Sequence, residues 1–396
     1  MEAVFYRSNP WWEEAYSFDG YTRDKYLKVL ERWLENKDIV FLTGLRRVGK
    51  TTILKNFIAT LIHEHNVAPE HIFYISLDLY VLDDYSISEI LDAYRKIHKL
   101  PSGQKVYLFL DEVTSKESYQ KELKNFYDLE NVKIFASSSS ASLLKDKNAY
   151  LTGRQRILEV MPLDFHEYLM FKGIHIKQAD THLWERYFED YMQDGGMPEY
   201  VLTSDVTYLQ NLIDNIINKD IIAHYHIRNN QIVKDFYKLL MERSGKQLSF
   251  NKIAGILDIS VDSAKRYYHY FEETYLVYGI EKYGKLNEKI KGAKKIYASD
   301  VGLRNVTVGY RDKGAIYENL VFLKIKDDHP SYLYVDGIEI DFITHNGILI
   351  EAKYHSKLND KQQKLFDRFA AKEKYVLNGY EGFALLDTLK ETPSFI

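Results

Sequence analysis

The sequence predicts an α/β protein whose N-terminal part is a parallel β-sheet flanked by helices, and three observations support this fold class. Apolar runs at 39–42, 71–77, 106–110 and 132–136 have the length and composition of strands that are buried on both faces. Residues 52–62 place apolar side chains at helical spacing soon after the first run. A glycine-rich segment follows the first run, and two carboxylates follow the third.

The glycine-rich segment, residues 44–51, fills every fixed position of the pattern G-x-x-x-x-G-K-[ST]. In such a loop, glycines let backbone N–H groups converge on phosphate oxygens, and the start of the next helix adds favourable partial charge. We expect Lys50 to reach the β- and γ-phosphates and the Thr51 hydroxyl to bind Mg²⁺. The residues expected to contact the nucleotide are Gly44, Arg46, Arg47, Val48, Gly49, Lys50, Thr51 and Thr52. An ordinary glycine turn is the plainer alternative, but the flanking strand and helix argue against it.

Two adjacent carboxylates follow the run at 106–110. Asp111 is expected to hold Mg²⁺ through water, and Glu112 to polarise the attacking water as a general base. The plainer alternative is a helix cap after a strand. The glutamate beside the aspartate, and the extra strand at 71–77 between the two motifs in sequence, are typical of additional-strand P-loop ATPases. The predicted core is therefore a P-loop NTPase sheet with ATP and Mg²⁺ as cofactors.

Two further groups could meet the γ-phosphate. Serines occupy residues 137–140 at the end of the fourth run, where Ser137 and Ser139 are candidates for sensing the phosphate, although a serine run is equally typical of a loop. Arg154 could contact the phosphate within the chain or across a subunit interface. An arginine that is solvated, or that pairs with a structural acid, is an equal alternative.

The composition narrows the class of protein. The chain has 396 residues, 45% of them hydrophobic and 28% charged, which is ordinary for a globular enzyme of two to four domains. Without cysteine it has neither disulfides nor cysteine nucleophiles. It lacks apolar runs of membrane-spanning length, and its first residues lack the order of a signal peptide, so we expect a cytoplasmic protein without membrane contact. The net charge of −4 confines nucleic-acid contacts to local basic patches.

Changes in pattern predict four domains. Residues 1–160 form the ATPase core with an N-terminal helical extension, in which Trp11 and Trp12 pack on the core. Residues 161–240 are helical and are expected to form a lid. Within them, the sequence Gly195-Gly196-x-Pro198 would let backbone approach a ligand or a neighbouring helix, although a helix stop explains it equally well.

Residues 241–298 predict a winged helix-turn-helix. Ser249 begins one helix, Ser260 or Asp262 caps a second, and residues 276–280 read as a wing strand. The second helix would present Lys265, Arg266 and His269, and the lysines beyond the strand are Lys282, Lys285, Lys289, Lys291, Lys294 and Lys295. Residues 241–300 carry eleven Lys or Arg and eight Asp or Glu, a mild footprint for duplex DNA. A winged helix used only for packing is the alternative.

The last predicted domain, residues 299–396, contains two strand-like runs around the loop 345–347. A two-residue turn would mix polar and apolar side chains on both faces of the hairpin. A three-residue loop with Gly347 in the left-handed conformation pairs Asp341 with Glu351 and Glu339 with Lys353. Only this second register produces one apolar and one charged face.

The charged face of that hairpin is a candidate metal site. Asp341 and Glu351 would bind a divalent metal, Glu318 on a helix at 315–325 could complete the ligand set, and Lys353 could position the attacking water. The alternative is a solvated hairpin face with cross-strand salt bridges.

Taken in order, these motifs resemble the archaeal and bacterial AAA-type P-loop ATPases with a C-terminal domain of unknown function, which are related to the signal-transducing ATPases with numerous domains (STAND). The resemblance covers nearly the whole chain and rests on the phosphate loop and on residues 110–112, 153–154, 162–168, 195–198, 299–303, 317–319 and 339–342. These families usually have Gly-Ser after the fourth strand, where this chain has serines only. The C-terminal segment is similar to the PD-(D/E)xK nuclease fold, with Asp341, Glu351 and Lys353 at matching positions, which implies an α/β restriction-endonuclease-like domain.

The main hypothesis is a Mg²⁺-dependent ATPase, with Lys50, Glu112 and Arg154 in catalytic roles, that engages double-stranded DNA through its winged helix and nuclease-like domain. One alternative is an ATP-regulated, metal-dependent DNA endonuclease. The other is a nucleotide-gated protein-binding switch with no nucleic-acid role. A homo-oligomer or a protein partner is compatible with each hypothesis.

Overall fold

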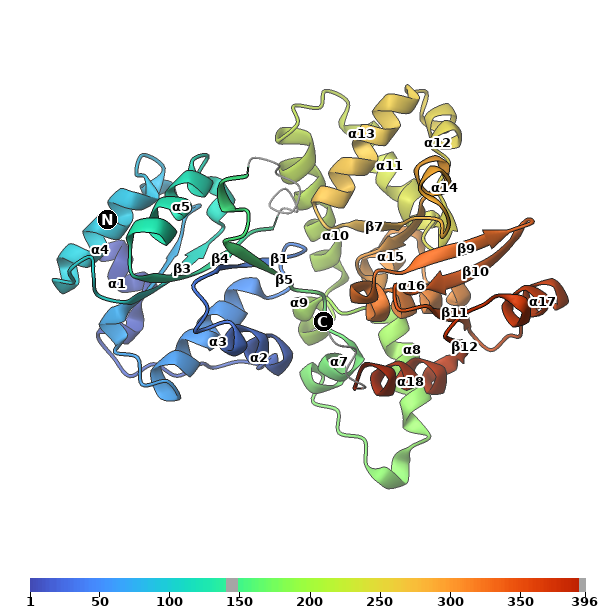
Figure 1. Ribbon diagram of the computed structural model, residues 1–396, viewed down its shortest axis with the longest axis horizontal. Coiled ribbons are helices and arrows are strands. Elements are labelled where there is room, and N and C mark those ends of the chain that lie inside the picture. Colours follow the sequence, from blue (N-terminus) through green and yellow to red (C-terminus); the bar gives the residue numbers. More distant parts are fainter. Residues whose placement is uncertain (140–148, 392–396) are drawn as a thin grey trace. The chain divides into compact units, whose positions relative to one another are not determined.

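The structure is a computed structural model that describes residues 1–139 and 149–391, grouped into two compact units, 1–161 and 162–396 (Figure 1). The first unit contains a five-stranded sheet in the order β2-β3-β4-β1-β5. Its strands are β1 (Ile39–Thr43), β2 (Ile72–Ser76), β3 (Val106–Asp111), β4 (Val132–Ser137) and β5 (Gln155–Glu159). All neighbouring pairs are parallel. The predicted parallel sheet of a P-loop NTPase-like fold is confirmed, and β4 separates the phosphate-loop strand β1 from the carboxylate strand β3.

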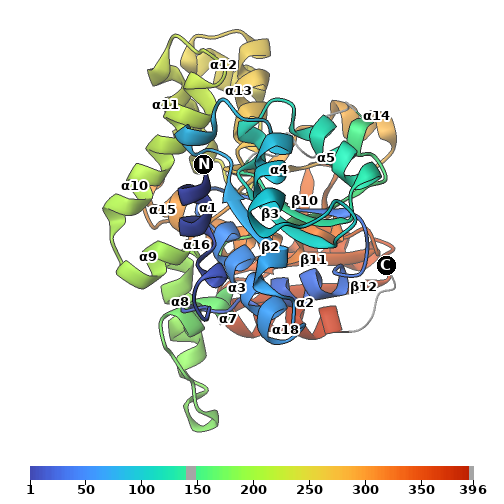
Figure 2. The same ribbon diagram turned by 90° about the vertical axis from the view of Figure 1, so that its left-hand side faces the viewer.

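Helices cover both faces of this sheet because side chains alternate between the faces along each strand. On one face, the Phe57 ring of α3 (Lys50–His63) lies 6.4 Å from Phe109 and 5.2 Å from Phe135. On the other face, α4 (Ile87–His98) and α5 (Tyr119–Leu129) pack on the buried residues that alternate with these phenylalanines. Figure 2 shows α4 and α5 on one side of β2 and β3, with α3 on the opposite side. The short 3₁₀ turns of this unit are Pro69–His71, Tyr80–Leu82, Val113–Ser115 and Ala149–Leu151.

The N-terminal segment covers the edge strand β2. It contains α1 (Glu2–Ser8), the 3₁₀ turn Pro10–Trp12 and α2 (Asp24–Arg32). The Asn9 amide donates to the Tyr74 carbonyl at 2.9 Å and accepts from the Tyr74 N–H at 2.6 Å, so it satisfies backbone groups that a strand would otherwise pair. Both indole N–H groups of Trp11 and Trp12 donate to the Ile72 carbonyl, which confirms the predicted packing of these two residues on the core.

The second unit begins with helices and continues into a small sheet. The helices are α7 (Phe165–Phe171), α8 (Leu183–Asp194), α9 (Pro198–Thr203), α10 (Val206–Asn215) and α11 (Asn230–Glu242), with a 3₁₀ turn at Gln178–Asp180 and a π-helix at Ile216–Ala223. They are followed by β6 (Lys246–Gln247), α12 (Phe250–Leu257), α13 (Val261–Glu273), β7 (Val277–Ile280), α14 (Leu286–Lys291) and β8 (Lys295–Ala298). The strands form an antiparallel sheet in the order β6-β8-β7. Ser249 accepts a hydrogen bond from Lys252 N–H and Ser260 one from Ser263 N–H, so both predicted serine caps are confirmed.

The C-terminal part contains a second sheet in the order β12-β11-β10-β9. Its elements are α15 (Val301–Val308), α16 (Lys313–Ile325), a 3₁₀ turn (Lys326–Asp328), β9 (Ser331–Val335), β10 (Ile338–Ile343), β11 (Ile348–Lys353), α17 (Asp360–Arg368), β12 (Glu373–Asn378) and α18 (Gly379–Glu391). Phe342 pairs with Ile350 and Ile343 with Leu349 across the β10–β11 hairpin, and Gly347 has a φ of 82°. The predicted three-residue loop and its register are therefore confirmed.

One apolar core joins the parts of the second unit. It includes Leu163 and Phe188 from the helical segment, Tyr297 from β8, and Phe342 from β10. The divisions predicted at 240 and 298 lie within this unit and stay predictions. Across the residues that the structure describes, every helix is too short or too polar to cross a membrane.

Candidate nucleotide-binding site and carboxylate cluster

The phosphate loop lies between the end of β1 and the first turn of α3, and all eight residues predicted to contact the nucleotide lie in this loop or at the start of α3. Gly44 has a φ of 131°, and a Cβ at this position would lie 2.3 Å from the Val160 carbonyl oxygen. Gly49 has a φ of 97° and begins α3, and a Cβ there would meet no atom within 4 Å. Gly44 is therefore required by a close backbone contact, and Gly49 by a left-handed turn that leaves the helix start open.

Lys50 is directed onto its own loop. Its ammonium donates to the carbonyl oxygens of Gly44 at 2.9 Å and Leu45 at 3.0 Å, and the side chain is buried. From outside the loop, buried Arg23 donates to the Val48 carbonyl at 2.9 Å. The sequence contains no signal for this contact, because Arg23 lies 25 positions from its partner and in no recognisable pattern. These contacts hold the loop in shape from inside and from outside.

The Asp111 carboxylate, at the end of β3, accepts hydrogen bonds from three hydroxyl groups. Thr51 donates to its Oδ2 at 2.6 Å, Tyr74 donates to the same oxygen at 2.9 Å, and Ser137 donates to Oδ1. Burial, together with the Asp111 carboxylate, raises the pKa of Tyr74, which keeps this phenol a hydrogen-bond donor. Thr51 and Asp111 are hard oxygen ligands of the kind that Mg²⁺ prefers, and the residues present fit this ion. Tyr74, on β2, has no sequence signal that points to this contact.

Glu112 follows directly and is held by the same strand tip. It has a φ of 49°, its N–H donates to Ser137 Oγ at 3.1 Å, and its Oε2 accepts from Ser139 at 3.3 Å. Burial raises the pKa of Glu112, and the nearby Lys50 partly offsets this effect. The structure thus brings Ser137 and Ser139 to the two carboxylates, whereas Ser140 lies outside the described residues.

Arg154 lies at the other end of the sheet. It immediately precedes β5, its carbonyl accepts from the N–H of Ile39 at 2.8 Å, and Ile39 is the first residue of β1. The phosphate loop follows the last residue of β1, and a strand of five residues spans roughly 17 Å. The guanidinium instead contacts Asp128 at 3.3 Å and the Tyr127 ring. This placement corrects the expectation of a γ-phosphate contact within the chain and favours the structural alternative, while a role across a subunit interface stays a prediction.

In the second unit, the structure brings together four carboxylates, Glu318, Glu339, Asp341 and Glu351, which we call the carboxylate cluster. At its centre lies Lys295 from β8, whose ammonium is 2.7 Å from Glu318, 2.6 Å from Glu339 and 3.0 Å from Asp341. Lys353 pairs with Glu351 at 2.6 Å. The three residues of the predicted metal site and Lys353 are therefore gathered, and no sequence pattern points to Lys295 as their partner.

Burial sets the electrostatics of the carboxylate cluster. Burial, together with Asp341, raises the pKa of Glu318 to about 8 and that of Glu351 to about 7. Burial alone would lower the pKa of Lys295, but Asp341 and Glu318 raise it well above its ordinary value. Lys295 is fully buried, which corrects its assignment to the DNA-contacting lysines. Within residues 1–139 and 149–391, no three acidic or histidine side chains are placed to hold a metal ion.

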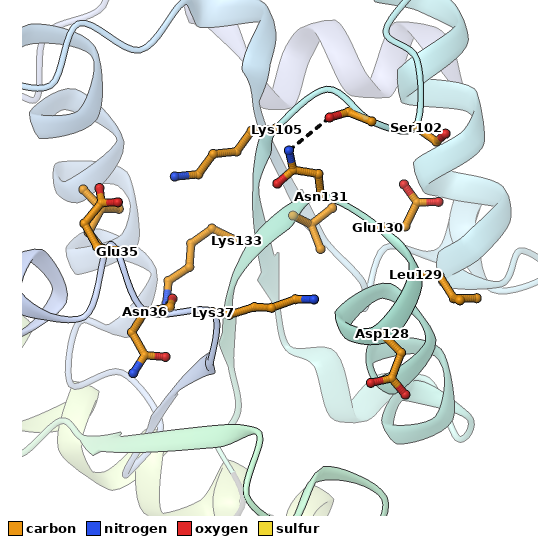
Figure 3. Close-up of a pocket in the computed structure, with 13 residues that line it drawn as sticks. Glu35, Asn36, Lys37, Ser102, Lys105, Asp128, Leu129, Glu130, Asn131 and Lys133 are labelled. Carbon is orange, nitrogen blue, oxygen red and sulfur yellow. Dashed lines mark hydrogen bonds between the residues drawn. The ribbon is translucent and has the colours of Figure 1, made fainter.

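A cavity of about 590 Å³ lies in the first unit, at the edge of the sheet opposite the phosphate loop. Residues 36–37, 105 and 131–133, which lie at or before the starts of β1, β3 and β4, line it (Figure 3). Lys133 donates from there to the carbonyls of Asn36 and Asp38, and burial lowers its pKa to about 8. None of the predicted site residues lines this cavity. The residues predicted to contact the nucleotide lie instead in the loop at the carboxyl ends of the strands.

The parallel sheet, the loop and the Asp111–Glu112 pair define the first unit as a P-loop NTPase domain. Residues 36–169 match the family model described as an AAA domain. Residues 185–313 match a domain of unknown function, DUF8612, which spans the predicted divisions at 240 and 298.

Relatives of known sequence align with most of the chain. An uncharacterized protein of Methanocaldococcus jannaschii is 28% identical over 370 residues, covering 86% of this chain and 81% of the relative. An uncharacterized protein of Haemophilus influenzae is 26% identical over 343 residues, covering 81% and 83% of the two chains.

Two solved structures illustrate the distant structural similarity of this chain. The Aeropyrum pernix ORC1 protein in complex with DNA has a TM-score of 0.35 and 12% identity, covering 79% of this chain and 94% of that one. The Thermotoga maritima RuvB Holliday junction branch migration motor has a TM-score of 0.32 and 16% identity, covering 64% and 87%.

Proposed function

We propose that the protein is a Mg²⁺-dependent ATPase that hydrolyses ATP in its AAA domain and engages duplex DNA through residues 241–298 and the C-terminal domain. One observation carries the catalytic part of the proposal. The Thr51 hydroxyl and the Asp111 carboxylate are joined at 2.6 Å, and Glu112 is held beside them by Ser137. This is the arrangement needed for a phosphate-bound Mg²⁺ and a water-activating base to act together.

Each residue of this site has a definite task. Lys50 would exchange its two loop carbonyls for phosphate oxygens, which bind an ammonium more strongly because they are charged. Thr51 and Asp111 would hold the ion, and Mg²⁺ would neutralise charge that develops on the phosphates. Glu112 would accept a proton from the attacking water.

The test of this proposal is the rate of ATP hydrolysis by the full chain, with and without duplex DNA. We expect turnover that requires Mg²⁺, stops when EDTA removes the ion, and rises when DNA is added. Turnover that persists in EDTA would contradict the catalytic part. If turnover depends on Mg²⁺ but duplex DNA neither binds to the protein nor changes the rate, only the DNA part of the proposal is contradicted.

Replacing Ser137 tests whether its hydrogen bonds position Asp111 and Glu112 for catalysis. It donates to Asp111 and accepts from the Glu112 N–H, so the Ser137→Ala change removes a contact from both. Hydrogen bonds to charged groups contribute about 1.5–3 kcal/mol, so we expect kcat to fall by about 10- to 100-fold with little change in ATP binding. The matched control is Ser138→Ala, because Ser138 is the neighbouring serine on the same segment and its hydroxyl contacts Thr114 at 3.1 Å. Equal rates for the two variants would remove Ser137 from this role.

The DNA part of the proposal is supported by element order and surface charge. The order α11, β6, α12, α13, β7, α14, β8 is compatible with a winged helix-turn-helix in which α13 takes the position of the recognition helix and α14 is inserted between the two strands of the wing. Lys265, Arg266 and His269 are exposed on α13. Lys294 is paired with Glu272 at 3.1 Å, so it adds little to the basic surface.

The double change Lys265→Gln and Arg266→Gln tests α13 as the DNA contact. Each phosphate contact contributes about one unit to the dependence of log affinity on log salt. We therefore expect weaker duplex binding and a salt slope that is smaller by about two, measured by fluorescence anisotropy between low and moderate salt. A control with the same charge change is Lys234→Gln with Lys238→Gln on α11, where aspartates already pair with both lysines. A slope that is the same for both double variants would argue against α13.

The nucleotide-gated protein-binding switch remains the second candidate, and one observation favours it. Leu286 and Ile290 lie one turn apart on α14 and are 70% and 71% exposed. Exposed apolar pairs of this kind are more typical of protein contacts than of phosphate contacts. Duplex binding that is absent at low salt would support this candidate over the DNA proposal.

A further inference from the structure

The carboxylate cluster raises a question that its resemblance to a nuclease site does not answer. A metal-dependent nuclease centre needs carboxylate oxygens that are open to a divalent ion, and Mg²⁺ demands near-octahedral oxygen ligands at about 2.0–2.1 Å. The cluster has four carboxylates with eight oxygens. Whether these oxygens are open or already bonded decides whether the site fits a metal.

Seven of the eight oxygens accept a hydrogen bond or ion pair from the protein itself. Lys295 binds one oxygen each of Glu318, Glu339 and Asp341. Neutral donors bind others: the Ala352 N–H binds Asp341 Oδ2, the Gln247 amide binds Glu339 Oε2, and the Asp341 N–H binds Glu351 Oε2. Glu351 Oε1 accepts from Lys353 at 2.6 Å and from Gln362 at 3.0 Å.

Lys295 uses its full hydrogen-bonding capacity in this position. An ammonium has three donors, and three carboxylates surround this one within 3.0 Å. The side chain is 1% exposed, and its ammonium lies 5.8 Å from the centre of the Phe342 ring and 6.0 Å from that of Tyr297. Leaving the cluster would deprive this buried ammonium of all three carboxylate partners, which is strongly unfavourable.

We propose that Lys295 takes the place of a divalent cation, so that the carboxylate cluster fastens β8 to α16 and β10 without metal. A divalent ion among the same oxygens would meet the ammonium as a like charge in a buried setting, where repulsion is weakly screened. The residues that resemble a nuclease centre therefore do not fit the metal that such a centre requires. The inference is independent of the proposed ATPase, which uses residues of the other unit.

The first test compares Mn²⁺ binding by the full, nucleotide-free chain with binding by its Asp341→Asn variant, using calorimetry. Mn²⁺ also probes the ATP site, so both proteins carry the Asp111→Asn change. We expect that neither protein binds Mn²⁺ tightly. A site of about one Mn²⁺ per chain that disappears with Asp341→Asn would overturn the proposal.

The second test removes the internal cation with the Lys295→Met change, again in the Asp111→Asn background. Methionine keeps roughly the length of the lysine side chain but carries no charge. We expect a lower melting temperature without metal, a Mn²⁺ site at least tenfold tighter than in the parent, and recovery of the melting temperature on adding Mn²⁺. Adding Asp341→Asn to this variant should abolish the new site. The control Lys294→Met changes the preceding residue, whose side chain pairs with Glu272 outside the cluster.

The Lys295→Met variant and the comparison of the parent with Asp341→Asn each give a decisive result. A folded Lys295→Met variant that gains no Mn²⁺ site would overturn the proposal. If that variant does not fold, the comparison of the parent with Asp341→Asn still decides the matter. Mn²⁺-dependent nicking of plasmid DNA by the parent, lost in Asp341→Asn, would establish the endonuclease alternative in its place.

Discussion

ATP hydrolysis by the Glu112→Gln variant is expected to be about 10²- to 10⁴-fold slower than in the parent, with ATP still bound. A general base contributes to the rate by this amount, and glutamine keeps the shape of the side chain but cannot take a proton from water. The structure holds Glu112 through its backbone N–H and the Ser139 hydroxyl, so the replacement should keep its position. Single-turnover hydrolysis and the affinity for a fluorescent ATP analogue, measured together, separate chemistry from binding.

The matched control for this variant is Glu117→Gln, because Glu117 is an exposed glutamate shortly after β3. It should hydrolyse ATP at the rate of the parent. If Glu112→Gln also hydrolyses ATP normally, Glu112 is not the base, and its position beside Asp111 is structural.

The pH dependence of kcat is a second, independent test of Glu112 as the base. Burial raises the pKa of Glu112 above its ordinary value. A base acts only when deprotonated, so kcat should rise with pH through this pKa and level off above it. The rising limb should be missing from the residual activity of Glu112→Gln.

The Lys50→Ala variant is expected to lose ATP hydrolysis by about 10³-fold or more, to the background rate. Removal of one preorganised donor from a developing charge commonly costs 10²- to 10³-fold, and Lys50 is in addition a full charge on the phosphates. ATP affinity should also fall, because the ammonium contributes before the reaction as well as during it. Steady-state hydrolysis and ATP titration measure the two effects.

Stability must be checked alongside, because Lys50 also bridges two carbonyls of its own loop. The melting temperature of the variant is therefore compared with that of the parent, so that a loss of hydrolysis is separated from a loss of folded protein. Lys55→Ala is the control on the same helix, where Lys55 is exposed and lies near the Tyr74 ring. Hydrolysis that survives in Lys50→Ala would reject the phosphate loop as the site of catalysis.

Local patterns predicted the elements that local forces decide. The phosphate loop follows from glycine spacing between a strand and a helix, and the structure shows why Gly44 must lack a side chain. The register of the β10–β11 hairpin follows from the alternation of polar and apolar residues together with the left-handed Gly347. The caps at Ser249 and Ser260 follow from side chains that reach backbone groups three residues away.

Contacts between distant segments could not be predicted in this way. Tyr74 reaches Asp111 only because β2 lies beside β3, and the strand order depends on packing over the whole sheet. Arg154 follows a plausible motif, yet the parallel pairing of β5 with β1 places it at the far end from the phosphate loop. A motif gives the type of side chain available for a task but not the end of the sheet at which it lies.

Local sequence patterns are enough to specify a phosphate loop followed by a helix, a carboxylate pair at the end of a buried strand, and a hairpin with one charged face. Each depends on residues a few positions apart, whose spacing is set by the periods of helix and strand. The partners of those charged groups, by contrast, depend on how the whole chain packs. Lys295 lies 46 residues from Asp341 in sequence and looks like one of several surface lysines, but folding buries it among three carboxylates. A charge that loses water must find a partner inside the protein, and which partner it finds is a property of the packed chain.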